Sequence, residues 1–344
     1  MTDPAVVLPL FGLNPKDYTV ERIGSGHIHH TFKLTGPSAF VLQRVNKDVF
    51  TRPDIIASNL RHASAHLAAT APAYRFVMPL RSPSGNDMEY DGEGYPWRLF
   101  PYLDHTLTVD SVQDARQAFE AASAFARLTR HLDGADASLF QATIPRFHDL
   151  ILRKQQFEEA LAGSGSRALE AQAEVAACQS YYPLVDRYAA LVAGKSLKLR
   201  VVHNDTKINN VLFDQRTGKT VAVIDLDTLM PGYFIYDLGD MVRTFVCPVS
   251  EEERDLSAIQ FRRQVYDAVV EGYLLEMGPV LSEGERKAIP FAGKMMTYIM
   301  ALRFLADFLR GNTYYHITYP DQNRVRAANQ LQLLNVLSEN LPED

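Results

Sequence analysis

The chain has 344 residues, 47% of them hydrophobic and 22% charged, which is a globular composition with room for two cores. Its formal net charge of −6, without a basic patch, argues against a protein that binds nucleic acid by neutralising phosphates. Two cysteines are too few for a disulfide scaffold, and we expect neither a signal peptide nor a membrane span of roughly 20 apolar residues, so the sequence predicts a soluble, cytoplasmic protein.

The first hundred residues alternate short apolar runs with glycine and proline turns, which predicts a meander of strands. One helix is expected among them, at 51–69, where isoleucines and leucines form a partial apolar stripe. The candidate strands are residues 18–23, 31–34, 40–45 and 97–103.

Helical periodicity takes over after residue 110, where Ser111 and Asp114 offer a capping signal. Further helices are expected at 148–162, 168–193, 254–276 and 283–310, with a β-rich interlude at 197–202, 211–213 and 221–224. A strand-rich front and a helix-rich back predict an α+β protein of two lobes. We place the N-terminal lobe at residues 1–103 and the C-terminal lobe at residues 104–344.

A polar segment follows the first strand of the interlude. It reads His203-x-Asp205-x-x-x-x-Asn210, and Asp225 comes twenty residues after Asp205, at the end of another apolar strand. Phosphoryl transfer needs a carboxylate to orient the acceptor hydroxyl and oxygen ligands for the Mg²⁺ that bridges the phosphates of ATP. We therefore predict that Asp205 is the catalytic carboxylate and that Asn210 and Asp225 bind magnesium.

Three neighbouring side chains complete this segment. His203 is expected to fix the loop through hydrogen bonds to the backbone. Lys207 either contacts the γ-phosphate or is solvated. Asp227 is either a second magnesium ligand, the reading we favour, or a hydrogen-bond acceptor for the loop.

A glycine hairpin lies between the first two candidate strands, in Gly24-Ser25-Gly26-His27. Glycines let the backbone approach phosphates closely, and successive N–H groups can bind them. Such a pattern alone is most often only a turn, but ahead of the catalytic segment it predicts a loop over the nucleotide, formed by Gly24, Ser25, Gly26 and His27. A metal cluster of the nearby histidines has no supporting carboxylate or cysteine spacing.

The catalytic segment resembles that of the aminoglycoside phosphotransferase family, relatives of protein kinases, whose pattern is His-x-Asp-x-x-x-x-Asn followed by Ile-Asp. The resemblance implies a two-lobed, protein-kinase-like fold with ATP bound by the N-terminal lobe. One position departs from the family: Gln43 or Arg44 stands where such kinases carry the lysine that pairs with nucleotide phosphates. Arg44 can supply that charge, and the following helix offers only Asp54 in place of the usual glutamate.

A closer resemblance is to the N-acetylhexosamine 1-kinases of this family, and it rests on residues 24–29, 42–46, 203–210 and 225–232. It implies phosphorylation of the anomeric hydroxyl of N-acetylglucosamine or N-acetylgalactosamine, with Asp205 accepting the hydroxyl proton. Asp237 is either a sugar contact or a helix cap. The other candidate sugar contacts are His30, Asp240, Arg303 and Tyr314.

Two other functions stay open. An amine-alcohol kinase, acting on choline or an aminoglycoside, would need acids or an aromatic cage around a cation, and the single tryptophan, Trp97, falls near the expected hinge instead. A nucleotide-binding pseudokinase would explain the replaced lysine, but it would not need Asp205, Asn210 and Asp225 together. The sequence leaves the preferred hexosamine, the nucleotide preference and the oligomeric state open.

Overall fold

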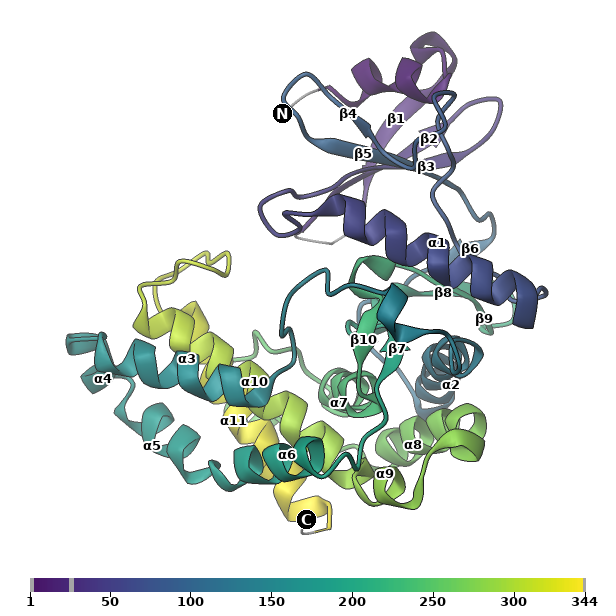
Figure 1. Ribbon diagram of the computed structural model, residues 1–344. Helices are drawn as coiled ribbons and strands as arrows, with labels where there is room; N and C mark the ends of the chain where they lie inside the picture. The colour runs from purple at the N-terminus through teal and green to yellow at the C-terminus, as the bar shows by residue number, and fades with distance from the viewer. Residues whose placement is uncertain (1–2, 25–27, 343–344) are drawn as a thin grey trace. The chain divides into compact units, whose positions relative to one another are not determined.

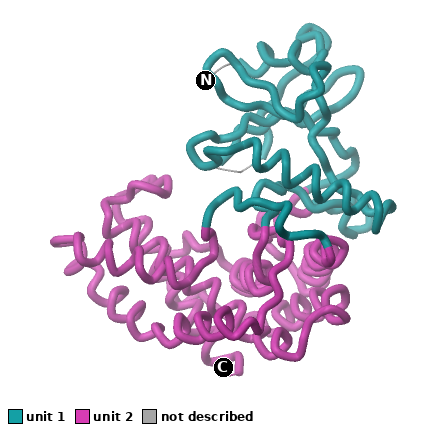
Figure 2. Tube along the Cα trace, in the orientation of Figure 1, with its two compact units in different colours: residues 1–107, 135–145, 212–230 teal, residues 108–134, 146–211, 231–344 magenta. Residues whose placement is uncertain are grey.

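The computed structural model describes residues 3–24 and 28–342, and the chain divides into two compact units (Figures 1 and 2). Unit 1 comprises residues 1–107, 135–145 and 212–230, and unit 2 comprises residues 108–134, 146–211 and 231–344. Unit 1 contains a five-stranded sheet and unit 2 is mostly helical, which confirms the α+β fold. The lobe boundary after residue 103 stays a prediction.

The sheet of unit 1 is antiparallel, with the order β1-β2-β3-β5-β4. Its strands are β1 (Thr19–Ile23), β2 (His30–Thr35), β3 (Phe40–Arg44), β4 (Glu89–Tyr90) and β5 (Pro96–Pro101). Alternate residues of a strand point to opposite faces. Phe32, Leu42 and Leu99 lie opposite one another in register, so they share one face. The N-terminal 3-10 helix Pro4–Phe11 packs against this core face (Figure 1).

The other face of the same sheet is polar. Thr31, Gln43 and Arg98 lie opposite one another in register and therefore share it. Arg44 pairs with His30 on the core face instead. The two residues that the sequence offered in place of a lysine thus point to opposite sides of the sheet.

Three separate segments of the chain build unit 1, and one side chain joins them. Asn59 lies on α1 (Pro53–Thr70), the helix expected at 51–69, and its side chain is 1% exposed. Its amide nitrogen donates to the main-chain oxygens of Gln141, at 2.8 Å, and Leu229, at 3.0 Å, and its oxygen accepts from the Gln141 amide. A three-stranded sheet, β6-β8-β9, also belongs here; its strands are β6 (Thr106–Leu107), β8 (Val211–Asp214) and β9 (Thr220–Val223).

Unit 2 is built around α7 (Phe234–Phe245), whose residues are nearly all buried. A Cβ added at Gly239 would clash with the main-chain oxygen of Ala292, and one at Gly293 would clash with Val242, so the two glycines let α7 and α10 approach closely. The other helices are α2 (Ala115–His131), α3 (Leu150–Ala162), α4 (Ser166–Glu170), α5 (Gln172–Ser180), α6 (Pro183–Ala193), α8 (Arg263–Met277), α9 (Glu283–Lys287), α10 (Ile289–Leu309) and α11 (Gln322–Asn340). A short sheet pairs β7 (Arg200–Val202) with β10 (Met230–Gly232).

Several predicted helix boundaries were wrong. The helix expected at 168–193 divides into α4, α5 and α6. Pro183 begins α6, where its missing N–H has no cost, which explains the second of these two divisions. The helix expected at 254–276 begins only at Arg263, and α11 was not predicted at all. Within the described ranges, no helix is long and apolar enough to cross a membrane.

Candidate active site

The loop that carries Asp205 follows β7 and is held from below by α7. Asp237, in the first turn of α7, is fully buried and accepts hydrogen bonds from the main-chain nitrogens of His203, at 3.1 Å, and Asn204, at 2.7 Å. Asn204 has a φ of 66°, a left-handed conformation that L-residues seldom adopt. The carboxylate of Asp237 therefore fixes a backbone turn that the chain alone would not favour.

Two further side chains hold the same loop. Asp240, one turn along α7, accepts from the Thr206 amide at 3.0 Å, and the Thr206 hydroxyl donates to the main-chain oxygen of Asp237 at 2.7 Å. His148 lies 2.8 Å, through Nε2, from the main-chain oxygen of Asn204. A carbonyl oxygen only accepts, so Nε2 carries the proton, and burial lowers the pKa of His148 to about 3, which keeps the ring neutral.

Sequence reasoning gave neither His148 nor this role of Asp237. Asp237 was expected to contact the sugar or to cap the helix, whereas its oxygens hold the loop that carries Asp205. The sequence did contain a signal, because Asp237 and Asp240 stand one helical turn apart in a largely apolar segment. A single histidine, such as His148, carries no comparable signal.

Asp205 itself keeps 27% of its side chain exposed and lies 3.4 Å, through Oδ1, from the Nζ of Lys207. Burial raises the pKa of the Asp205 carboxyl, but the charge of Lys207, with smaller contributions from His203 and Arg243, outweighs it and holds the pKa below its usual range. The His203 ring accepts the Asp205 amide at 3.2 Å, so it has the expected architectural role. The site thus presents an ionised carboxylate on a rigid backbone.

Asn210 is oriented by Asp205. Its amide nitrogen donates to the main-chain oxygen of Asp205 at 2.9 Å, which turns the amide oxygen outward. That oxygen accepts no hydrogen bond from the part of the chain that the structure describes. A hard oxygen donor with this geometry fits a magnesium ligand.

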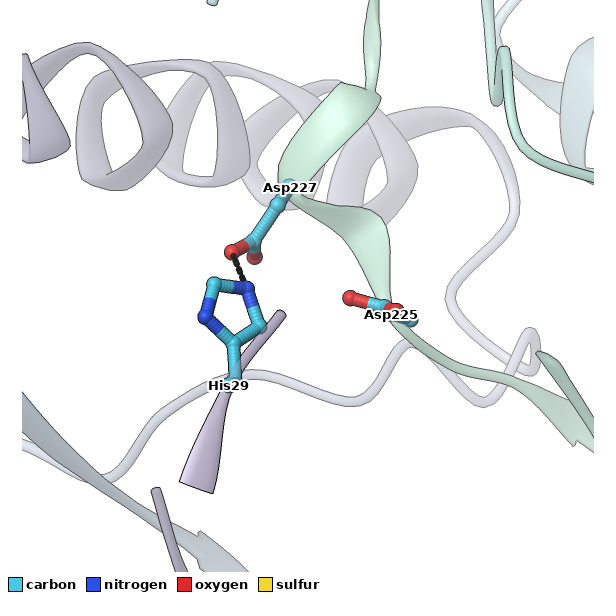
Figure 3. A group of neighbouring side chains, drawn as sticks. All are labelled: His29, Asp225 and Asp227. Atoms are coloured by element: carbon cyan, nitrogen blue, oxygen red, sulfur yellow. Dashed lines mark ion pairs between the residues drawn. The ribbon is translucent and has the colours of Figure 1, made fainter. Parts of the chain in front are cut away.

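A second group of acids lies in unit 1, after β9, and Figure 3 shows it. Asp225 is exposed and has a left-handed φ of 57°, whereas Asp227 is 2% exposed. One ligand atom from each of His29, Asp225 and Asp227 lies within 4.8 Å of the others, a spacing that fits a divalent cation. Asp227 also pairs with Nη1 of Arg98 at 2.6 Å and Nε2 of His29 at 2.9 Å.

These two partners, Arg98 and His29, decide the charge of Asp227. Burial raises the pKa of its carboxyl, but the charge of Arg98 and the hydrogen bond from His29 outweigh burial and hold the pKa well below its usual range. Arg98 is a residue that sequence reasoning missed. The signal was a single charge within an apolar strand, because a buried arginine needs a partner.

The predicted nucleotide contacts are placed only in part. Gly24 has a φ of 82°, which glycine adopts without strain, but Ser25, Gly26 and His27 lie outside the described residues. Arg44, on the core face of the sheet, stacks on the Tyr95 ring with its guanidinium carbon 3.6 Å from the centroid.

Among the predicted sugar contacts, Arg303 and Tyr314 lie together in unit 2. The guanidinium carbon of Arg303 lies 5.3 Å from the ring centroid of Phe147, 5.8 Å from that of Tyr314 and 5.4 Å from that of Tyr315. Among the described residues, its only hydrogen bond is to the sulfur of Met300, at 3.6 Å. Arg303 therefore holds a cation with unused donors inside an aromatic frame.

Asp307 fixes the loop that supplies two of these rings. It is buried on α10 and accepts from the main-chain nitrogens of Thr313, Tyr314 and Tyr315, each at 2.9 Å. Tyr314 remains 63% exposed. The backbone next to Arg303 is thus rigid, while the tyrosine ring faces solvent.

Positive charge near Arg303 is not neutralised locally. Burial, with the charge of Arg303, lowers the pKa of Arg153 to about 10. Neither arginine has an ion-pair partner within residues 3–24 and 28–342. The charges of both Arg303 and Asp205 act on His148, so this positive region lies close to the candidate catalytic carboxylate.

The remaining predicted sugar contacts are more occupied. Asp240 gives one oxygen to the Thr206 amide and the other to Arg243, at 2.9 Å. His30 lies on β2, in register with Arg44 on the core face of the sheet of unit 1.

Known proteins resemble this chain in sequence pattern and in fold. A model of the phosphotransferase enzyme family matches residues 19–272. The structure of the microcompartment-associated aminopropanol kinase is similar with a TM-score of 0.66 and 14% identity, covering 97% of this chain and 95% of that one. The structure of an amicoumacin kinase in complex with AMP-PNP and Ca²⁺ is similar with a TM-score of 0.58 and 15% identity, covering 98% of this chain and 93% of that one. The structure of a choline/ethanolamine kinase family protein from Mesorhizobium loti is similar with a TM-score of 0.53 and 15% identity, covering 93% of this chain and 88% of that one. At these identities the likeness to the structures concerns the fold alone.

Proposed function

This chain belongs to the phosphotransferase enzyme family and is a small-molecule kinase, and we propose that it transfers the γ-phosphoryl group of ATP to the anomeric hydroxyl of an N-acetylhexosamine. The family match covers both the predicted glycine hairpin and the catalytic segment, so the family expected from the sequence is confirmed. The acceptor is the part that we propose.

The observation that carries this acceptor is Arg303. A guanidinium without an ion-pair partner, with Arg153 beside it, disfavours a cationic acceptor and leaves donors for hydroxyl or acetamido oxygens. The aromatic frame suits the apolar face of a sugar ring. Tyr314 is the proposed second contact, and Asp240 is less available because both its oxygens are engaged.

In the proposed reaction the acceptor oxygen attacks the γ-phosphorus, the bond to the β-phosphate oxygen breaks, and ADP leaves. Asp205 takes the hydroxyl proton, since its lowered pKa keeps it ionised at neutral pH. Asp225 and Asn210 are the proposed ligands of Mg²⁺, whose charge offsets that of the phosphates when it is bound. Lys207 is a proposed phosphate contact with 48% of its side chain exposed.

An amine alcohol is the second candidate acceptor. Its support is that the similar structures include an aminopropanol kinase and a choline/ethanolamine kinase family protein. A cationic acceptor would have to approach Asp205 past the unneutralised charges of Arg303 and Arg153.

Blocked sugars test the proposal. With ATP and Mg²⁺, N-acetylglucosamine or N-acetylgalactosamine should yield a 1-phosphate, identified by phosphorus NMR, and the methyl glycosides should yield no product. Phosphorylation of a methyl glycoside at the rate of the free sugar would exclude the anomeric hydroxyl. Turnover of choline or an aminoglycoside, with none of any sugar, would establish the second candidate instead.

Arg303 gives a second test. Arg303→Ala should raise the sugar KM about 10- to 100-fold, the size expected for lost charge-assisted hydrogen bonds, and leave the ATP KM near that of the unaltered enzyme. Arg263→Ala, which removes an arginine from an exposed ion pair, is the matched control and should change neither. Equal rises in both KM values would contradict a role in acceptor binding.

A further inference from the structure

The polar face of the sheet in unit 1 carries a partly buried chain of hydrogen bonds, ending in an ion pair, that the proposed reaction does not use. Gln43 donates through its amide nitrogen to the hydroxyl of Thr31 at 3.0 Å, and its oxygen accepts from Nε of Arg98 at 2.9 Å. Arg98, 1% exposed, then reaches Asp227 through Nη1 at 2.6 Å. Strands β2, β3 and β5 are thereby joined to the segment that follows β9.

His29 contacts the other oxygen of Asp227, and a hydrogen bond shows which of its ring nitrogens carries the proton. The Asn46 amide donates to Nδ1 of His29 at 3.1 Å, so in the neutral ring Nδ1 is the acceptor and Nε2 carries the proton. That Nε2 faces Oδ2 of Asp227 at 2.9 Å and donates to it (Figure 3). His29 therefore has no nitrogen left for a metal ion, and both oxygens of Asp227 are already engaged by His29 and Arg98.

We propose that Asp227 is a positioning residue and not a metal ligand: Gln43 and Arg98 hold it so that the neighbouring turn presents Asp225 to the metal. The inference rests on the proposed function only in assigning Asp225 to Mg²⁺, and it is independent of the acceptor.

The turn explains how the effect travels. Asp225 immediately precedes the 3-10 turn Leu226–Thr228 and adopts a left-handed conformation, so its direction depends on where Asp227 is anchored two residues later. The same network gives a reason for Gln43. A lysine there would place a second cation against the buried guanidinium of Arg98, whereas the glutamine supplies a neutral acceptor.

The test measures metal binding directly, by calorimetric titration of Mn²⁺ into the enzyme with ADP present. Asp227→Asn and Arg98→Met should each weaken Mn²⁺ binding about 10- to 100-fold, the usual effect of losing a group that orients a metal ligand. The double variant should bind Mn²⁺ as tightly as the single variant with the lower affinity, because both changes remove the same support. The matched control removes an exposed pair of unit 1, in Arg52→Met/Asp54→Asn, and should bind as the unaltered enzyme does.

A direct ligand would behave differently. If Asp227→Asn weakens Mn²⁺ binding by the same factor with and without Arg98, the carboxylate contacts the metal and the proposal is overturned. Asp225→Asn tests the proposed metal ligand separately from the positioning role of Asp227. Unchanged Mn²⁺ affinity in that variant would remove the metal assignment of the proposed function, whatever Asp227 does.

Each single variant leaves a buried charge unpaired and so risks not folding. Gln43→Met avoids this, because it removes the two hydrogen bonds that Arg98 donates to Gln43 and keeps the ion pair of Arg98 with Asp227. It should weaken Mn²⁺ binding several-fold while leaving the acceptor KM unchanged. An unchanged Mn²⁺ affinity in a folded Gln43→Met enzyme would overturn the role of the network.

Discussion

The two loops that carry the candidate catalytic and metal-binding acids are held in opposite ways. In unit 2, the buried carboxylates of Asp237 and Asp240 bind main-chain amides, so the backbone is fixed and the side chain of Asp205 stays accessible. In unit 1, Arg98 and His29 bind the side chain of a buried acid, Asp227. A backbone held in place carries its side chain without engaging it, whereas a carboxylate held by two side chains has fewer lone pairs left for a ligand.

The largest expected effect is a loss of turnover when the side chain of Asp205 is changed and the groups that hold its loop are left in place. Asp205→Asn should lower turnover about 10²- to 10⁴-fold, because the proton acceptor is lost. Thermal stability and ADP binding should change little, since the anchors of the loop are untouched. Turnover above a tenth of the unaltered enzyme would exclude Asp205 as the base.

Removing the exposed acid of unit 1 should act on binding as well as turnover. Asp225→Ala is expected to weaken binding of Mg²⁺–ADP, measured by calorimetry, by more than about 100-fold, because a ligand should matter more than a group that only orients one. Asn210→Ala should act in the same direction with a smaller effect. Normal affinity in the Asp225 variant would place the metal elsewhere.

Asp237, which holds the candidate catalytic loop, should contribute to the free energy of unfolding. Asp237→Ala leaves the buried amides of His203 and Asn204 without their acceptor and should cost about 1–3 kcal/mol for each, measured by urea unfolding. Asp136→Ala, which removes an exposed helix-capping acid of unit 1, is the control and should cost less. An unfolding free energy equal to that of the unaltered protein would show that Asp237 does not hold the loop.

The smallest expected effect concerns an ion pair in unit 2. In it an arginine binds the side chain of a buried acid, as Arg98 binds Asp227 in unit 1. Arg200, on β7, lies with Nη2 3.1 Å from Oε2 of Glu285. Burial raises the pKa of Glu285, but its hydrogen bonds, above all the one from Arg200, lower it by more than burial raises it. The net pKa is therefore below its usual range. Glu285→Gln should cost about 1 kcal/mol at neutral pH, since Gln retains part of the hydrogen bonding.

The pH dependence gives the sign of that effect. A carboxyl whose pKa is lower in the folded state stabilises the protein above its unfolded pKa of about 4.3, and the contribution is lost as pH falls through the folded value. The difference between the unaltered protein and Glu285→Gln should therefore be largest near pH 7 and shrink below about pH 4, measured by urea unfolding. A difference that grows on acidification would contradict this assignment.

The candidate catalytic loop could be recognised in the sequence because its residues are contiguous and their spacing is itself the signal, and its role stays a prediction. It could not predict the pairing of Arg98 with Asp227, since nothing local states which distant acid meets a buried arginine. Nor could it choose between Gln43 and Arg44, because only the register with β2 and β5 assigns each to a face. The helix α11 escaped prediction because Asn323, Asn329 and Gln330 occupy buried positions and interrupt its apolar stripe.

The bonds of Asn59 have a consequence for how the protein is made. Synthesis of residues 1–107 completes all five strands of the sheet, yet Asn59 binds Gln141 and Leu229, and the ion-pair partner of Arg98 is Asp227. Until the ribosome has passed residue 230, the amide of Asn59 lacks its acceptors in the finished fold, and Arg98 has Gln43 but not its ion-pair partner Asp227, which is unfavourable. Unit 1 is therefore first in sequence but cannot be the first to finish folding, and its sheet must wait, incompletely packed, for a strand and turn made more than a hundred residues later.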